Sequence, residues 1–502
     1  MTGQRVKSGY GNLPPSTLPG VQPRDDFFLG LWYHGGVAVE DTTDWGVAVM
    51  AKKKAAAQHS NRIEGKVGGA RHCRRDFLVA TLSAVAGPQI IAASALGKGS
   101  QVAPSERIAV GCIGMGNRGP MLMRSFLGQK DARVVAVCDV NGKQREKAEQ
   151  IVDRHYGDSG CAAYNDFREL CGRPDIDAVC IASPDHWHVL HSLEAVRRGK
   201  DIYTEKALGL SLAQDKALRA ACHRYGTVFQ WGTQQRSSEN FRFGCELVRN
   251  GRIGKLHTIL VGVPHDFAFP NQPTQPVPKD LDYDLWLGPA PWAPYTYHRC
   301  RPWTPKESYS IWYHISDYCL GGIGGYWGIH HLDIAQWGHG TDHTGPVEVD
   351  GTATFPDDGL ADCAVRWKVR HKYADGVTMV YTDKTQNKQG VVFQGSEGWV
   401  YVRRGHIDAE PKSLLTSQIG PGEIHLPKTP GHQREFLDCI KSRKQTVSNI
   451  NIAVRSDTIS HLTDICTRLK RKIRWDPDTE QILGDADASR MLSRSMREPW
   501  HI

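Results

Sequence analysis

The sequence predicts an α/β protein of two domains, the first built on a parallel sheet flanked by helices. Three observations support this prediction. A chain of 502 residues is longer than one hydrophobic core usually holds. Its 40% hydrophobic and 23% charged residues are ordinary for a globular protein. From residue 107 onward, short apolar runs alternate with helix-compatible stretches, which is typical of repeated strand–helix–strand units.

The first apolar run leads directly into a glycine-rich turn. RIAVGCIGMGNRG places Gly114, Gly116 and Gly119 in the spacing G-x-G-x-x-G, and the helix-compatible stretch PMLMRSFLGQ follows. One glycine allows the tight turn, one lets backbone N–H groups approach a pyrophosphate, and one lets the helix pack on the strand. The helix N-terminus then faces the phosphate charge. We therefore predict a Rossmann dinucleotide-binding domain over 107–231, with Asn117 and Arg118 in its phosphate-binding turn.

The second apolar run, RVVAVCDV, ends in Asp139, 20 residues after Gly119. An acidic side chain at this position accepts hydrogen bonds from the ribose 2′-OH and repels a 2′-phosphate. The predicted cofactor is therefore NAD, with NADP less favoured. Lys143 and Arg145 lie close enough in the chain to soften this preference.

In two later stretches, DIDAVCIASP and DIYTEKALGL, an apolar strand is followed by polar side chains. Ligands of parallel sheets bind at the carboxyl ends of the strands. The first run leads into SPDHWH at 183–188, and the second contains Glu205 and Lys206. Both strand ends are therefore candidate sites.

The first 97 residues are predicted to be a leader. The stretch RRDFLVATLSAVAGPQIIAASALG from Arg74 resembles a twin-arginine signal peptide, and its central Gly-Pro interrupts the apolar run too early for a stable membrane span. The stretch MAKKK from Met50 has the character of a basic n-region. We therefore expect translation to start at Met50, with 1–49 not translated, and the folded protein to be exported to the periplasm or beyond.

Charge and cysteine content exclude other classes. The net charge is +8, but residues 1–97 contain 11 Lys+Arg against 7 Asp+Glu, so +4 lies in the leader. The rest carries no basic block, and no nucleic-acid partner is predicted. The 13 cysteines form no C-x-x-C pair or zinc spacing and are expected to be small buried hydrophobes, with one or two disulfides open as the alternative.

From about Arg107 to Trp500 the chain resembles the Gfo/Idh/MocA family, which includes glucose-fructose oxidoreductase and inositol dehydrogenase, and in particular its exported bacterial members. SPDHWH resembles the family motif T-P-N-x-x-H, which contacts the cofactor. The resemblance implies this role for Ser183, Pro184, Asp185 and His188.

Two more motifs extend the resemblance. Glu205-Lys206-Ala207 resembles E-K-P, which implies cofactor contacts for Glu205 and Lys206 and makes Lys206 the catalytic lysine. GGIGGYWGIHHLDIAQW resembles the glycine-rich segment with D-x-x-x-H, which makes His330 the catalytic histidine. Ala207 replaces the motif's proline, which predicts a looser loop.

Tyr326 stands where the family has aspartate, and we include it in the predicted catalytic set. Asp333 and His331 are the alternatives expected to compensate for the missing carboxylate. Adjacent helical residues point about 100° apart, so only one of His330 and His331 is expected to be catalytic. These side chains lack the i, i+4 pairing of a helical zinc site, and no metal site is predicted.

The resemblance implies an α/β domain over 232–440 with a mostly antiparallel open sheet that joins subunits into a homo-oligomer. Helices and a tail over 441–502 are expected to return to the first domain. GTATFPDDG, CAVRWKVRHKYADGVTMVYTD and GVVFQGSEGWVYVRR alternate as strands do. The residues expected to line the substrate site are Gln234, Arg236, His331 and Asp333. For the stretch GTQQRS, which contains Gln234 and Arg236, a role in an interface is an equally open alternative.

Hydride transfer from an alcohol carbon needs a base for the hydroxyl proton and a cation for the alkoxide. Lys206 supplies the charge and His330 a proton-transfer group. We expect them to face one another across one cleft, with Tyr326 one turn before His330 on the same helix. The predicted function is an NAD(H)-dependent oxidoreductase acting on a sugar or polyol. One version of this prediction is an enzyme whose cofactor stays tightly bound and is recycled by a second substrate. An NAD-dependent glycosidase and a noncatalytic sugar-binding relative stay open as alternatives.

Overall fold

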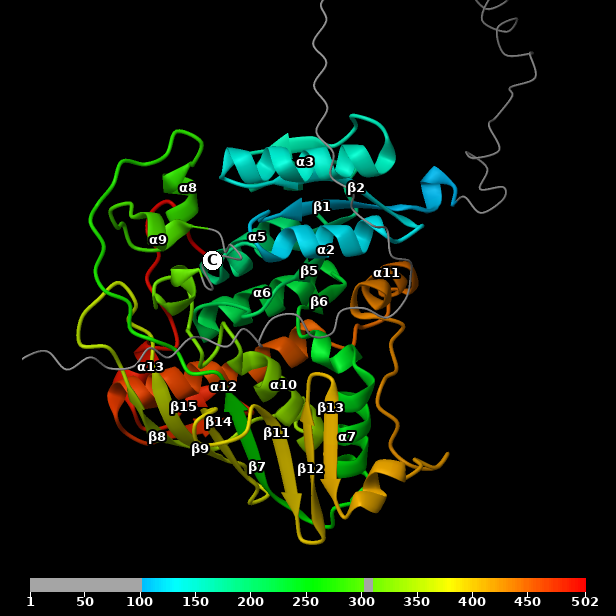
Figure 1. Cartoon of the computed structure of the whole chain (residues 1–502), viewed down its shortest axis with the longest axis vertical. Helices are drawn as coiled ribbons and strands as arrows, with labels where there is room; N and C mark the ends of the chain where they lie inside the picture. Colours follow the sequence, from blue (N-terminus) through cyan, green and yellow to red (C-terminus); the bar gives the residue numbers. More distant parts are fainter. Residues whose placement is uncertain (1–101, 302–309) are drawn as a thin grey trace, which may run out of the picture. The chain divides into compact units, whose positions relative to one another are not determined.

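The computed structural model describes residues 102–301 and 310–502, and Figure 1 shows how their elements are arranged. The predicted leader, with its signal sequence and start site, lies outside the described residues. The described part is built on a parallel sheet followed by a mostly antiparallel one, with helices packed on both. The predicted fold class is therefore confirmed.

The first sheet is parallel throughout, and its strand order is β3-β2-β1-β4-β5-β6. The chain order reverses between β1 and β4, where such sheets bind ligands. Its strands are β1 Ile108–Ile113, β2 Ala132–Cys138, β3 Ala162–Tyr164, β4 Ala178–Ile181, β5 Asp201–Thr204 and β6 Phe229–Trp231. Its helices are α2 Arg118–Leu127, α3 Gly142–Tyr156, α4 Phe167–Cys171, α5 Asp185–Arg197 and α6 Leu212–Tyr225.

Local sequence sets the limits of these elements. The α3 helix begins after Asn141, whose side chain accepts a hydrogen bond from the backbone N–H of Gln144 at 3.3 Å. It ends at Gly157, whose φ of 71° is a left-handed conformation that glycine adopts without a steric penalty. The strand β1 is almost entirely buried, as its apolar sequence requires.

The second sheet has the order β13-β12-β11-β7-β10-β9-β8-β14-β15. Among its described strands only β7 and β10 pair in parallel. They are β7 Leu256–Val263, β8 Glu348–Thr354, β9 Arg366–Lys372, β10 Thr378–Asp383, β11 Gly390–Gly395, β12 Gly398–Arg403, β13 His406–Glu410, β14 Ile473–Asp476 and β15 Gln481–Ile482. The accompanying helices are α7 Glu239–Arg249, α8 Tyr283–Leu287, α9 Tyr297–Cys300, α10 Gly328–His339, α11 His432–Ser442, α12 Ile450–Leu469 and α13 Ala486–Arg490.

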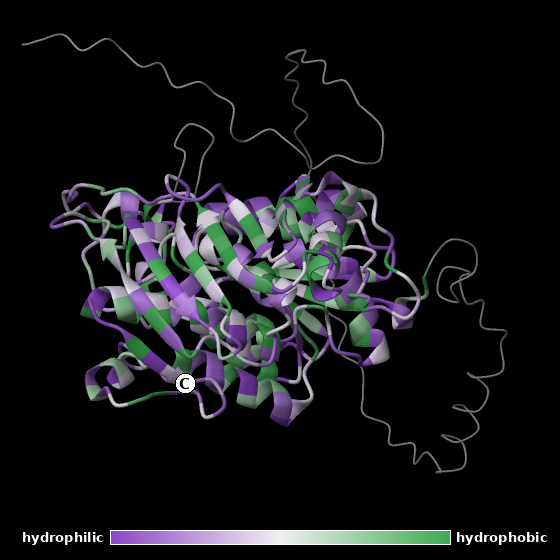
Figure 2. Cartoon of the chain, turned by 90° about the horizontal axis from the view of Figure 1, so that it is seen from below, coloured by the Kyte–Doolittle hydropathy of each residue, from purple (hydrophilic) through white to green (hydrophobic). Residues whose placement is uncertain are grey.

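One face of this sheet is covered by helices, because α7 packs on β12, α10 on β7 and β11, and α12 on β8. The strand β9, RWKVRHK, alternates exposed and buried side chains along its length, and Figure 2 shows such alternation as bands along the strands. Trp367, Val369 and His371 are buried, while the basic residues between them are exposed. This is the pattern of a sheet with one solvated face.

The C-terminal segment packs on both sheets. The α11 helix joins the first domain, where Arg434 pairs with Asp131 and the Phe436 ring lies 5.9 Å from that of Tyr203. The α12 helix lies between α6 and β8. The return towards the first domain thus begins with α11, before the predicted segment 441–502.

The twelve cysteines of the described part are free thiols, and all but Cys300 are buried. This confirms the expectation that they act as small core residues. No helix in the described ranges is long and apolar enough to cross a membrane.

Candidate functional site

The glycine-rich turn joins β1 to α2, and its glycines have different surroundings. Gly114 has a φ of 84°, and a Cβ there would lie 2.4 Å from the backbone nitrogen of Ser183. A Cβ on Gly119 would lie 1.9 Å from the carbonyl oxygen of Gly114. Packing therefore demands glycine at these two positions. A Cβ on Gly116 would meet no atom within 4 Å, and this open space fits a pyrophosphate that approaches the backbone.

Asp139 directly follows β2. Its carboxylate accepts hydrogen bonds from two backbone N–H groups, one of them that of Met115 at 2.6 Å. Burial raises the pKa of Asp139 to about 6, although these bonds and the charge of Arg145 act in the opposite direction. Each carboxylate oxygen can accept a second bond, so the predicted ribose contact fits the geometry. Arg145 bonds the Asp139 carbonyl and Lys143 pairs with Asp280, so the protein already engages both basic residues.

Glu205 connects the glycine-rich turn to the segment after β6. Its Oε1 accepts hydrogen bonds from Arg118 at 2.8 Å and from Gln234 at 2.9 Å. Burial pushes the pKa of Glu205 upward, but the charges of Arg118 and Lys206 outweigh burial and hold it below its usual value. The predicted cofactor residue Arg118 and the predicted substrate residue Gln234 therefore meet at one carboxylate. Asn117 is the N-cap of α2, beside them.

The loop between β4 and α5 contains Ser183 and Pro184, and Asp185 is the first residue of α5. His188 lies in the first turn of this helix. Its Nδ1 lies 2.6 Å from the carbonyl oxygen of Ala207, and its Nε2 lies 2.8 Å from that of Ser183. His188 therefore ties two strand-end loops together and has a positioning role. Ala207 is completely buried, and its carbonyl oxygen is held by this bond.

Lys206 follows β5 and reaches the second domain. Its Nζ donates hydrogen bonds to the carbonyl oxygens of Gly325 at 2.6 Å and Tyr326 at 3.4 Å. The same Nζ lies 5.7 Å from the centroid of the Tyr313 ring. A Cβ on Gly325 would lie 2.4 Å from Oδ2 of Asp185, which places that carboxyl beside the same turn. Burial raises the pKa of Asp185, and the positive charges of His188 and Lys206 oppose the rise.

The turn that receives Lys206 leads directly into α10, where His330 lies in the first helical turn. Tyr326 lies before the helix, so the prediction that it shares a helical face with His330 is wrong. Four glycines between 321 and 325 disfavour helix there, and α10 begins only at Gly328. Burial lowers the pKa of His330 well below its usual value, and the charges of Arg404 and Lys206 act in the same direction. His330 is therefore a neutral imidazole near pH 7.

His331 faces a different partner, since its Nδ1 lies 3.2 Å from Oε1 of Gln235. Burial lowers the pKa of His331 to about 3. The Trp327 ring lies 6.0 Å from the His330 ring and 5.9 Å from the His331 ring. The two adjacent histidines thus share an aromatic neighbour but differ in their hydrogen-bond partners.

Arg236 and Asp333 lie together in a fully buried ion pair. The guanidinium bonds both oxygens of Asp333 at 2.7 Å and also pairs with Asp342. Ser456 donates a further hydrogen bond to Asp333 at 2.8 Å. Because these groups satisfy one another, we leave Arg236 and Asp333 out of the proposed substrate site. The carboxyl groups that interact with Lys206 are those of Glu205 and Asp185, not that of Asp333.

Asp185 and Tyr313 lie near Lys206, and sequence reasoning did not predict that position for either residue. Asp185 was expected at the cofactor, within a motif. Tyr313 lies in a short 3-10 turn, Ile311–His314, among many aromatic residues. No spacing in the sequence singles it out.

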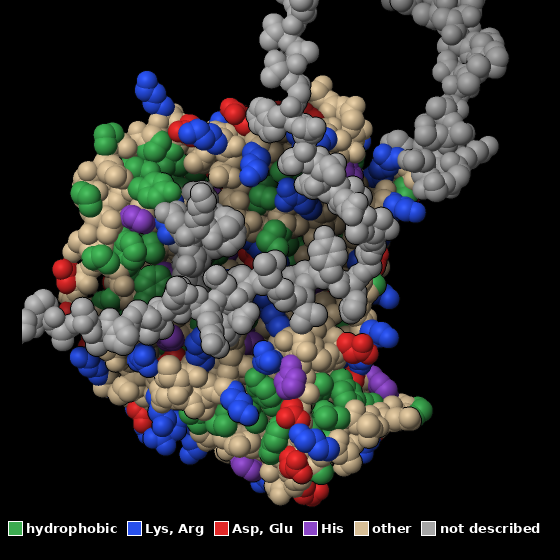
Figure 3. All heavy atoms as spheres, in the orientation of Figure 1, with side chains coloured by type: hydrophobic (Ala, Val, Ile, Leu, Met, Phe, Trp, Pro, Cys, Tyr) green, Lys and Arg blue, Asp and Glu red, His purple; other side chains and the backbone are tan. Residues whose placement is uncertain are grey.

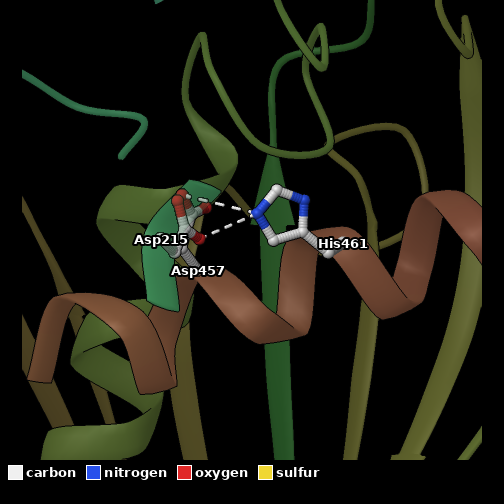
Figure 4. Close-up of side chains that lie close together, drawn as sticks. All are labelled: Asp215, Asp457 and His461. Carbon is white, nitrogen blue, oxygen red and sulfur yellow. Dashed lines mark hydrogen bonds and ion pairs between the residues drawn. The ribbon is translucent and has the colours of Figure 1, made fainter. Parts of the chain in front are cut away.

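The described residues contain one group with the spacing of metal ligands, formed by Asp215, Asp457 and His461 and shown in Figure 4. His461 Nε2 lies 2.9 Å from Oδ2 of Asp215 and 3.9 Å from Oδ2 of Asp457. The same Asp457 oxygen accepts the backbone N–H of Leu208 at 2.8 Å. The group therefore connects α6, α12 and the loop that follows Lys206.

Comparisons with known proteins agree with this geometry. Residues 108–233 match the model described as "Oxidoreductase family, NAD-binding Rossmann fold", and residues 266–502 match "Oxidoreductase family, C-terminal alpha/beta domain". Fold and site thus define a two-domain α/β protein with an N-terminal Rossmann domain. The chain belongs to the Gfo/Idh/MocA oxidoreductase family.

Individual relatives cover shorter stretches. The chain is 28% identical over 176 residues to myo-inositol 2-dehydrogenase from Thermotoga maritima, which is 35% of this chain and 47% of that protein. It is 34% identical over 110 residues to a glycosyl hydrolase family 109 protein from Saccharopolyspora erythraea, 21% of this chain and 24% of that protein. The chain spans about half or less of the length of these curated relatives.

Among solved structures, the aldose-aldose oxidoreductase from Caulobacter crescentus, complexed with glycerol, superposes with a TM-score of 0.55 at 16% identity. A levoglucosan dehydrogenase in complex with NADH and levoglucosan gives a TM-score of 0.52 at 16% identity. Each match covers 73% of this chain and 99% of the other. At this identity the likeness concerns the fold.

Proposed function

We propose that this protein is an NAD(H)-dependent oxidoreductase that transfers hydride between an alcohol carbon of a sugar or polyol and the cofactor. The observation that carries the proposal is the placement of Lys206. It leaves the carboxyl end of β5, beside the glycine-rich turn, and bonds to the turn that begins the His330 helix. The charge of Lys206 helps to lower the pKa of His330, which supports a site with a cation and a neutral imidazole at the edge where such sheets bind ligands.

Different residues of the chain stabilise charge and transfer the proton. Lys206 stabilises the negative charge that develops on the substrate oxygen. His330, neutral because of its burial, accepts the hydroxyl proton. Gly114, Gly116, Gly119 and the start of α2 hold the cofactor's pyrophosphate. NAD, when bound, supplies the acceptor for the hydride.

The test is a comparison of Lys206→Met with Lys130→Met, a surface substitution in the first domain. We expect Lys206→Met to lower turnover by about a hundredfold or more and to leave NAD binding within a few-fold of wild type. Turnover is followed by absorbance at 340 nm over a panel of sugars and polyols, and NAD binding by calorimetry. Wild-type turnover in Lys206→Met, or loss of NAD binding, contradicts the proposed role.

A second candidate function is NAD-dependent glycoside cleavage, which the glycosyl hydrolase family 109 relative favours. The redox and hydrolytic outcomes differ in their products. Aryl glycosides incubated with the NAD-loaded protein release an aglycone without net NADH formation only if cleavage takes place. Net NADH without aglycone release supports the dehydrogenase.

We also propose that the protein is exported through the twin-arginine route and forms a homo-oligomer through its second sheet. The signal-like stretch from Arg74 supports the first proposal. The exposed face of the second sheet supports the second.

A further inference from the structure

Arg404 lies at the tip of the β12–β13 hairpin. Arg403 and His406 form the last cross-strand pair, so Arg404 and Gly405 make the two-residue turn. Gly405 has a φ of 68°, as tight hairpin turns often require. Figure 1 shows this turn at the end of the strands that faces the first domain.

The guanidinium of Arg404 lies against Trp327, the N-cap residue of α10. Its Cζ is 4.6 Å from the centroid of the Trp327 ring. Guanidinium groups favour such stacking on aromatic rings. Trp327 in turn contacts the rings of His330 and His331. The charge of Arg404 is felt there, because it contributes to lowering the pKa of both histidines.

This cation has no carboxylate partner among the described residues. The side chain is open to solvent, yet surrounding protein desolvates it and lowers the pKa of Arg404 to about 10, with the charge of Arg118 acting in the same direction. Glu205 opposes this shift, but Glu205 already bonds Arg118 and Gln234. Arg236, by contrast, has two carboxylates within bonding distance.

Three cations therefore lie near the proposed substrate position, and the carboxyl groups beside them are those of Glu205 and Asp185. Lys206 and Arg118 approach from the first domain and Arg404 from the second. Arg404 is exposed and no carboxylate of the described residues is bonded to it, so its guanidinium is available to bind an anion. Guanidinium groups bind carboxylates and phosphates through two parallel hydrogen bonds.

We propose that Arg404 binds an anionic group of the substrate, so that the protein acts on a sugar bearing a carboxylate or phosphate in preference to a neutral sugar. This inference rests on the proposed function, because it assigns the substrate class of the same site. The stack on Trp327, beside His330, places the anion on the substrate side of the site.

The experiment compares matched probes on the NAD-loaded protein: D-glucose with D-glucuronate and D-glucose 6-phosphate, and D-galactose with D-galacturonate and D-galactose 6-phosphate. Binding is measured by calorimetry and turnover at 340 nm, in 50 mM and 500 mM NaCl. In wild type we expect an anionic probe to bind about ten- to a hundredfold more tightly than its neutral counterpart. Salt should reduce this ratio. The two anionic arms show whether carboxylate or phosphate is preferred.

The matched variants are Arg404→Met and Arg403→Met, which remove neighbouring arginines of one hairpin. Arg404→Met should abolish the anion preference and leave NAD affinity unchanged, whereas Arg403→Met should retain the preference. Loss of NAD affinity in Arg404→Met would instead assign this arginine to the cofactor's phosphates and overturn the inference. Equal binding of anionic and neutral probes, or binding of none, also overturns it. Arg404-dependent anion binding without turnover of any probe would leave this inference standing while the proposed function fails.

Discussion

At the scale of single residues, Asp139 is the group through which the cofactor site responds to pH. Burial raises its pKa to about 6, so the carboxylate is ionised at neutral pH and mostly protonated at pH 5. A ribose hydroxyl donates most strongly to the ionised form. We expect NAD affinity to fall about tenfold between pH 7.5 and pH 5, measured by calorimetry.

Two variants test this assignment. Asp139→Ala should weaken NAD binding about ten- to a hundredfold and narrow the preference for NAD over NADP, because the 2′-OH loses its acceptor and a 2′-phosphate loses its repulsion. Asp139→Asn should remove most of the pH dependence between 5 and 7.5. If both variants bind NAD as wild type does at every pH, the ribose is bound elsewhere.

At the scale of elements, α12 supports the loop that carries Lys206. Asp457 accepts the backbone N–H of Leu208, two residues after the lysine, and Ser460 donates to the other oxygen of Asp457. Figure 4 shows how Asp457 and His461, from α12, meet Asp215 from α6. The helix thereby connects the second sheet to the strand-end loop of the first.

This contact predicts a pH effect on stability. Burial raises the pKa of Asp457 to about 6, and the neighbouring Asp215 adds to the rise while His461 opposes it. The folded state therefore holds a proton that the unfolded chain, with a carboxyl pKa near 4, has released. The stability contributed by this proton is present below about pH 4 and is lost as the pH rises through about 6.

Wild type and Asp457→Asn are therefore compared by urea unfolding at several pH values. The burial of Asp215 and His461 changes stability in both proteins, so the difference between the two isolates Asp457. The free energy of unfolding of wild type relative to the variant should fall by on the order of 2 kcal/mol between pH 4 and pH 7. Asp438→Asn, on the surface of α11, is the control. A pH-independent difference for Asp457→Asn would contradict the assignment.

Features that depend on neighbouring residues in the chain could be predicted. The turn from Gly114 to Gly119 follows from spacing, and the strands β8 to β12 follow from alternating side chains between turns. Lys206 and His330 could be found because each belongs to a local motif. Each of these motifs spans about a dozen residues or fewer of the sequence.

Features that depend on tertiary contacts could not be predicted from the sequence. The pairing of Arg236 with Asp333 joins residues 97 positions apart, and each alone has the character of a substrate-binding group. The start of α10 after Tyr326 reflects a glycine-rich turn that Lys206 binds through backbone carbonyls. Arg404 carries no motif, and its importance comes from the absence of a carboxylate partner among the described residues.

At the scale of the whole molecule, basic and acidic side chains are interspersed over the described part of the face in Figure 3. On the second sheet, the exposed positions of β9 are Arg366, Lys368, Arg370 and Lys372. The last two lie opposite Asp350 and Glu348 of β8, and such cross-strand pairs are favourable. The outer face of this part of the sheet is therefore charged.

A homo-oligomer formed through this face should depend on salt. Charged contacts at an exposed surface are screened at high ionic strength, whereas an apolar contact is not. We expect light scattering after size exclusion to give an oligomer in 50 mM NaCl and a smaller species in 500 mM NaCl. Lys368→Glu, which reverses one charge in the centre of β9, should favour dissociation at low salt, while Lys130→Glu in the first domain should not. An oligomer that persists in high salt and in Lys368→Glu places the contact on another surface, and a monomer under all conditions excludes association through the sheet.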